Sequence, residues 1–168
     1  MADLDIVTLI LSEHEAFRRD FEALESLTDT AELAQAWRSL ADRLEVHASA
    51  EEVIFYPALL RKVDEAEEDT EHAIKDHNKI RSAAHSVDPH EVGTDEWWTA
   101  VHDARDENNE HLDEEEKDVL PPFREEVDSA TRDELGTKWI GFHEQHENAK
   151  GLSGKEKDSE AYVEKHTP

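Results

Sequence analysis

The chain has 168 residues, of which 44 are acidic and 18 basic, so its formal net charge at pH 7 is −26. A surface this negative repels phosphate backbones and anionic lipids, which argues against nucleic acids and membranes as partners. The absence of cysteine excludes disulfides, thiol catalysis and thiolate metal sites, and the low content of Gly and Pro favours helix over sheet.

Apolar residues recur at helical spacing in five stretches of the chain, and the predicted helices cover about residues 4–27, 30–62, 71–87, 94–120 and 130–148. The break at Thr28–Thr30 offers an N-cap for the second helix, and Pro57 is expected to kink that helix or to begin its last segment. The acidic stretch 64–70 is expected to be a connection or a helix cap. Long amphipathic helices with short connections predict an all-α fold, an antiparallel, up-down-up-down four-helix bundle with a short fifth C-terminal helix.

A single domain is expected over residues 1–149, followed by a loose polar tail over 150–168 in which Glu160–Val163 offers a short docking patch. The N-terminal stretch is apolar only over Ile6–Leu11, with no basic region before it. We therefore expect neither a signal peptide nor a membrane span, and a cytoplasmic protein that is a monomer or a weak dimer.

One pattern occurs twice in the chain. His47–Pro57 and His111–Pro121 both read His-x3-Glu-Glu-x4-Pro, and a further histidine precedes each copy: His14 lies 33 residues before His47, and His77 lies 34 residues before His111. A histidine and a glutamate four residues apart share one face of a helix, so imidazole and carboxylate are presented together, twice.

The repeated residues fall in the apolar stripes of the predicted helices, namely His14, His47, Glu51, His77, His111 and Glu115. A single buried histidine is usually a satisfied core residue, and one His-x3-Glu is expected by chance among 11 His and 44 acidic residues. The duplication favours metal, because two buried carboxylates without a partner would cost several kcal/mol each, on the order of the stability of a whole domain. The second glutamates, Glu52 and Glu116, point about 100° away on an ideal helix and are expected to matter less.

The type of metal follows from the donors. Mixed imidazole and carboxylate donors suit iron, manganese or zinc, and two carboxylates among four imidazoles suit a pair of metals bridged by the carboxylates. Ferritin-like di-iron bundles use Glu-x-x-His, which is a different order and spacing from the one found here.

These motifs, taken together, resemble the hemerythrin family, specifically the hemerythrin-like HHE cation-binding proteins. The matching pieces are Glu13-His14-Glu15, His47-x3-Glu51 with Tyr56-Pro57, Asp76-His77, and Glu110-His111-x3-Glu115-Glu116. The resemblance implies a four-helix bundle around a non-haem centre of two iron ions joined by an oxo or hydroxo bridge. It also implies that Glu51 and Glu115 bridge the irons, with His14 and His47 on one iron and His77 and His111 on the other.

The chain departs from the oxygen-carrying hemerythrins on the third helix, where those proteins have a His-x3-His pair. The residues four positions from His77 are Ala73 and Arg81. His72 is five positions away, about 140° around an ideal helix, and is a poor substitute. One ligand of the carriers is therefore missing, which argues against simple reversible oxygen carriage.

Two replacements for the missing ligand remain open. The fifth helix carries Glu144 and His146, of which Glu144 is favoured, because some hemerythrin-like proteins resemble this and draw a carboxylate from that region. Tyr56 is out of phase with His47 on an ideal helix, but Pro57 can disturb the helix and turn the ring inward as a phenolate ligand; the alternative is a half-buried core aromatic.

Three functions compete on this evidence. The first is a redox enzyme whose di-iron centre disproportionates peroxide or reduces another small oxidant, as in defence against oxidative stress. The second is binding or sensing of O2 or NO, and the third is iron buffering without turnover. A sensor usually carries an output domain and a carrier needs the full ligand set, so the first function is favoured, with H2O2, O2 or NO as the small-molecule partner.

Overall fold

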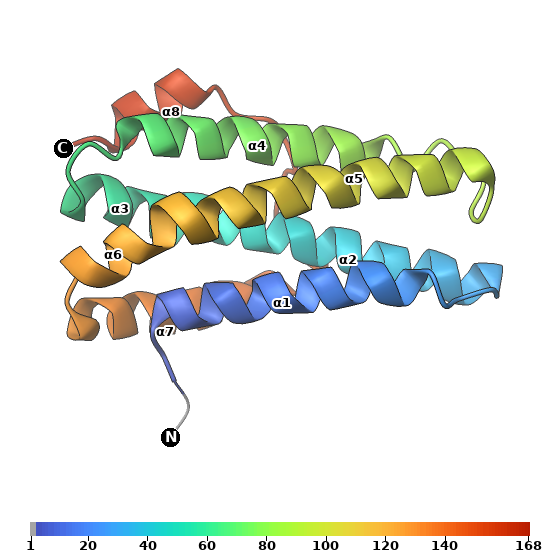
Figure 1. Cartoon of the computed structure of the whole chain (residues 1–168), viewed down its shortest axis with the longest axis horizontal. Coiled ribbons are helices and arrows are strands. Elements are labelled where there is room, and N and C mark those ends of the chain that lie inside the picture. The colour runs from blue at the N-terminus through green and yellow to red at the C-terminus, as the bar shows by residue number, and fades with distance from the viewer. Residues whose placement is uncertain (1–2) are drawn as a thin grey trace.

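The computed structural model describes residues 3–168, and those residues contain helices and no strand. Four long helices lie side by side along the longest axis of the molecule (Figure 1): α1 (Ile6–Leu24), α2 (Thr30–Ala50), α4 (Glu67–His85) and α5 (Asp95–Glu114). The shorter helices are α3 (Tyr56–Lys62), α6 (Leu120–Glu126), α7 (Ser129–Gln145) and α8 (Ser159–His166), and a 3-10 turn covers Glu147–Ala149. The predicted all-helical fold is confirmed, and the arrangement is consistent with a helical bundle.

Short polar side chains fix where the helices begin. In α1, α2, α5, α7 and α8, the side chain of the N-cap residue accepts a hydrogen bond from a backbone N–H of the first turn. These N-cap residues are, in order, Asp5, Asp29, Thr94, Asp128 and Asp158. The cap expected between Thr28 and Thr30 is Asp29. In the acidic stretch predicted as a connection or cap, Glu67–Asp69 form the first turn of α4, where acidic side chains are favoured by the helix dipole.

The two prolines of the repeat neither end nor sharply break their helices. α2 and α5 each pass into a π-helical turn, η1 (Glu51–Phe55) and η2 (Glu115–Val119), and then continue as α3 and α6 with Pro57 and Pro121 in the first turn. Proline lacks an N–H and clashes with the carbonyl four residues earlier in a regular α-helix, and the wider π turn removes that conflict. The repeated pattern therefore produces the same local structure twice.

The C-terminal segment is not the loose tail that was predicted. α8 packs against α4, and its Tyr162 is buried, with its hydroxyl donating to the backbone carbonyl of Glu52. Before α8, the Lys157 backbone N–H donates to Asn78 of α4. The expected docking patch at Glu160–Val163 therefore lies on the bundle, anchored by an aromatic ring.

Two apolar clusters fill the interior, and the histidine positions separate them along α1 and α2. On α1, Ile10 belongs to one cluster and Phe17 to the other, with His14 between them. On α2, Leu44 and Ala50 flank His47 in the same way. A polar layer thus crosses the middle of the core. Within residues 3–168, the helices are too short or too polar to span a membrane.

Candidate metal centre

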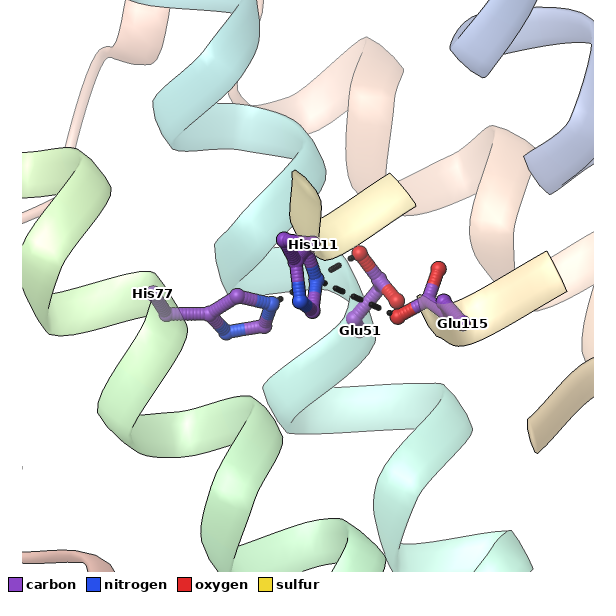
Figure 2. Close-up of side chains that lie close together, drawn as sticks. All are labelled: Glu51, His77, His111 and Glu115. Carbon is purple, nitrogen blue, oxygen red and sulfur yellow. Dashed lines mark ion pairs between the residues drawn. The ribbon is translucent and has the colours of Figure 1, made fainter. Parts of the chain in front are cut away.

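The polar layer gathers the six residues of the repeated pattern from six helical elements. In chain order these are His14 of α1, His47 of α2, Glu51 of η1, His77 of α4, His111 of α5 and Glu115 of η2, and none is more than 3% exposed. Figure 2 shows four of them, with the His77 and His111 rings directed at the two carboxylates. The structure therefore brings together all six residues predicted from the repeat.

Each glutamate of the layer lies between two histidines, one from its own copy of the pattern and one from the other copy. Glu51 Oε1 is 2.7 Å from His47 Nε2 and 3.7 Å from His77 Nε2. Glu115 is 3.1 Å from His14 Nε2 through Oε1 and 3.3 Å from His111 Nε2 through Oε2. Two groups of donors result, with Glu115 in both: His14, His47 and Glu115, and Glu51, His77, His111 and Glu115.

The atoms that face the centre have no hydrogen-bond partner of acceptable geometry, even where two of them approach closely. They are the Nε2 atoms of all four histidines, both carboxylate oxygens of Glu51, and Oε1 of Glu115. Buried polar atoms in native proteins are nearly always satisfied. So many unsatisfied lone pairs directed at one point are what a site for positive ions requires.

A second ring of carboxylates holds the outer nitrogens of the histidines. His14 Nδ1 is 2.9 Å from Glu116, His47 Nδ1 is 3.0 Å from Glu13, and His111 Nδ1 is 3.1 Å from Asp76. His77 has a looser relation, with Nδ1 3.6 Å from Glu52. A carboxylate at the outer nitrogen places the proton there and leaves Nε2 as a lone-pair donor, as in histidines that bind metal.

Glu52 and Glu116, which were predicted to point away from the centre and to matter less, have charged partners of their own. Glu52 is 2% exposed and accepts hydrogen bonds from Arg81 at 2.5 Å and from Lys157 at 3.1 Å. Glu116 links His14 to Arg18, whose guanidinium donates to it at 2.7 Å. Both residues do point away from the centre, but each thereby reaches the back of a histidine in the other copy. The signal that could have found them is the doubled glutamate in both copies.

Burial and mutual repulsion shape the protonation of the two central carboxyls. Burial, followed by the negative charge of Glu115, raises the pKa of Glu51 to about 8. Burial also opposes ionisation of Glu115, but contact with the Glu51 carboxyl and with the His111 and His14 imidazoles holds its pKa well below the usual value. Without a cation the pair therefore keeps one proton, and a cation would displace it because it stabilises both carboxylates.

Tyr56 is turned into the centre. It is fully buried, and its hydroxyl donates a hydrogen bond to Glu115 Oε2 at 2.5 Å. The π turn before it changes the helical phase that an ideal α-helix would give, as the disturbance at Pro57 led us to expect. Burial, together with the negative charges of Glu115 and Glu51, raises the pKa of Tyr56 well above 10, so the group beside the carboxylate is a neutral phenol.

The structure does not bring Glu144 or His146 to the centre. Glu144 is exposed and lines a surface groove, and His146 Nδ1 is 2.8 Å from the Lys150 carbonyl. The face of α7 that meets the bundle carries Trp139 and His143, which both form hydrogen bonds with the Glu13 carboxylate. Trp139 Nε1 lies 2.5 Å from Oε2, and His143 Nε2 lies 3.0 Å from Oε1. Glu144 follows His143 and so points about 100° away. α7 thus acts on the outer carboxylate ring and does not supply a donor facing the centre.

The donor set fits hard or borderline divalent and trivalent metal ions. Four imidazole nitrogens and two carboxylates suit iron, manganese or zinc, and the described residues 3–168 include no thiolate that would select softer metals. Two overlapping groups of donors, which share Glu115, could each hold a metal ion. A metal site here explains both the unpaired donor atoms that face the centre and the carboxylates that hold the outer nitrogens of the histidines.

Comparison with known families agrees with this chemistry. The family model that matches the chain, over residues 5–123, is the hemerythrin HHE cation binding domain. The matched range contains all six central residues and Tyr56, and ends before α7 and α8. No curated protein and no solved structure matches the chain.

Proposed function

Because the chain belongs to the hemerythrin family of HHE cation-binding domains, we propose that it is a non-haem di-iron protein that reacts with a small oxidant, most simply by disproportionating hydrogen peroxide. The observation that carries the proposal is the set of unpartnered buried donor atoms, with one hydroxyl, that of Tyr56, held among them. An oxygen carrier needs donors for metal only, whereas peroxide chemistry also needs a proton source.

In this proposal each ion takes two histidines and shares the two carboxylates. His14 and His47 would hold one ion, His77 and His111 would hold the other, and Glu51 and Glu115 would bridge them. A centre of two iron ions supplies two electrons to an oxidant and takes two back from a reductant. The balanced reaction converts two H2O2 into O2 and two H2O, so that one peroxide loses two electrons and two protons and the other gains them.

The residues around the centre would handle those protons. The Tyr56 hydroxyl is a neutral donor beside Glu115, and both line a cavity of about 360 Å³ that opens to the surface. A peroxide that arrives through this cavity meets the hydroxyl at the edge of the centre. Tyr56 can donate its proton to a peroxide oxygen and recover one from the second peroxide.

The position that carries an additional histidine in oxygen carriers supports the enzyme proposal over reversible carriage. Arg81, four residues after His77, donates to Glu45 at 2.9 Å and to Glu52 at 2.5 Å, so this side chain is fully engaged as a cation. Ala73, four residues before His77, has no donor atom. The ion beside His77 and His111 would therefore have fewer imidazoles than in a carrier and a vacant position for a substrate.

The test combines metal analysis with turnover. Protein produced with sufficient iron is expected to contain close to two iron ions per chain, and the aerobic protein is expected to be diferric and to evolve O2 from H2O2. His111→Ala is expected to lose metal and activity together. One tightly bound zinc per chain would contradict the di-iron proposal. A stable, reversible oxygenated form without peroxide turnover would instead favour binding or sensing of O2.

A further inference from the structure

A second group of metal-type donors lies at the mouth of the cavity that leads to the centre. It consists of His72, Asp76 and Glu114, whose donor atoms all lie within 4.8 Å of one another. His72 Nε2 is 2.8 Å from Glu114 and 3.6 Å from Asp76. Their side chains are 55%, 39% and 11% exposed for His72, Glu114 and Asp76, so the group faces solvent at one end and the interior at the other.

The cavity joins this outer group to the buried centre. Its volume is about 360 Å³, and the same wall contains the outer three residues and the inner Tyr56, His111 and Glu115. At the inner end, His111 Nε2 and Glu115 Oε1 are buried polar atoms without partners. Asp76 belongs to both ends, since its Oδ2 lies 3.6 Å from His72 and 3.1 Å from His111 Nδ1.

The charge of the mouth favours cations. Besides the outer group, the cavity is lined by Asp69, Asp113 and Asp118, and by one basic side chain, Lys117. Clefts lined by one sign of charge concentrate ions of the opposite sign and raise their rate of association. A different cavity, of about 200 Å³, is lined by His77 together with two basic and three acidic side chains, so its wall is less negative than that of the cavity at the outer group.

We propose that His72, Asp76 and Glu114 form an outer cation site through which divalent metal ions load the buried centre. One imidazole and two carboxylates are donors that suit ferrous iron and ions like it. An arriving ion would displace the contacts within the group, bind there briefly, and pass Asp76 and His111 on its way inward. The proposal rests on metal binding at the centre, as proposed above, and adds the path that the ion takes.

The test measures loading rate separately from final metal content. Metal-free protein is mixed with Co²⁺, whose visible absorbance reports binding at the centre, and bound metal is counted after equilibration. His72→Ala/Glu114→Gln should load about tenfold more slowly than the unchanged protein, with the same final metal content and the same melting temperature when loaded. Asp69→Asn/Asp118→Asn, which removes charge but no donor of the group, should also slow loading, and more so at low salt.

A matched control lies near the other end of the bundle. His102 and Glu25 form an exposed pair with 2.5 Å between Nε2 and Oε1, comparable in type and exposure to His72 and Glu114. His102→Ala/Glu25→Gln should load at the unchanged rate. Equal loading rates for the His72 variant and this control would overturn the outer site, as would a loss of final metal content in the His72 variant. Failure of the unchanged protein to bind metal would instead reject the proposed function.

Discussion

The Tyr56 hydroxyl is a proton donor at the centre that is neutral before it donates. It lies 2.5 Å from Glu115 Oε2, and its pKa is well above 10 because burial and the adjacent carboxylates disfavour the phenolate. Tyr56→Phe keeps the ring and its contacts with Phe55 and His77. We therefore expect unchanged iron content and a rate of O2 evolution from peroxide lower by about 100-fold.

The measurement is kcat for peroxide together with iron per chain in the same sample. An active Tyr56→Phe protein would remove the proton-donor role from the mechanism. A variant that loses iron would show that the hydroxyl supports the metal site itself.

Glu52 and Glu116 occupy equivalent positions in the two copies of the pattern but differ in their surroundings. Arg81 and Glu52 form a buried pair, 3% and 1% exposed, whereas Arg18 and Glu116 are 27% and 29% exposed and Arg18 also contacts Asp113. Glu52→Gln removes one of the two carboxylates that compensate the buried Arg81 and leaves Glu45 as the other, which is expected to cost about 3 kcal/mol of unfolding free energy. Glu116→Gln should cost under about 1 kcal/mol.

Denaturant unfolding of the two metal-free variants makes this comparison directly. Each serves as the control for the other, because the chemical change is identical. Equal losses of unfolding free energy in the two variants would mean that burial does not increase the contribution of the Arg81–Glu52 pair to stability.

At the scale of elements, α7 determines the state of an outer carboxylate. Burial opposes ionisation of Glu13, but hydrogen bonds with His143 and His47 lower its pKa from 4.5 to about 2. A carboxyl whose folded pKa is lowered stabilises the protein above the unfolded value of 4.5, and this stabilisation is lost as the pH falls toward 2. His143→Phe should therefore cost about 1–2 kcal/mol above pH 5 and almost nothing near pH 2.

Unfolding free energies of the metal-free protein across pH 2–6 test the role of α7. His146→Phe, at the residue that caps the C-terminus of α7, is the control, because His146 contacts the Lys150 carbonyl and not Glu13. If His143→Phe lowers the unfolding free energy by the same amount at every pH, the loss comes from packing and not from the ionisation of Glu13.

The elements also show which parts of the structure the sequence could predict. Helical periodicity predicted the long helices, and the duplicated pattern predicted the six central residues. Both signals can be read from nearby positions in the sequence, and histidines within an apolar stripe are unusual. The outer partners of the histidines could not be predicted from helical phase, since Glu52 and Glu116 act across copies and through tertiary contacts. α8 was missed because its sequence is polar and its docking depends on one ring, Tyr162. Glu144 was favoured by analogy, whereas the contact face of α7 carries His143.

For the whole molecule, metal binding and folding should be linked in a way that depends on pH. Burial opposes protonation of His14, His77 and His111, but the adjacent carboxylates raise the pKa of each above 6.5. A raised folded pKa stabilises the metal-free protein below pH 6.5 and this contribution is lost as the pH rises through the folded value. Metal ions need neutral imidazoles, so metal affinity should rise over the same range.

The expected outcome is that the increase in melting temperature on adding metal is larger at pH 8 than at pH 6. At a free metal concentration about 1,000 times Kd, the gain in stability should be about 4 kcal/mol. Melting curves with and without metal at both pH values provide the measurement, and Glu51→Ala/Glu115→Ala should show no gain at either. A metal-dependent gain that falls with pH would contradict the linkage.

The exchange of glutamates between the two copies has a consequence for how the chain is held together. Glu51 reaches His77, and Glu115 reaches His14, so neither half of the chain contains a complete set of donors. The halves are joined by an exposed turn at Asp64–Glu65, where Glu65 has a left-handed backbone with φ of 60°. A chain cleaved at this turn should behave as two subunits that associate when metal is supplied and separate when a chelator removes it. The metal ions would then hold the two fragments together in place of the cleaved peptide bond.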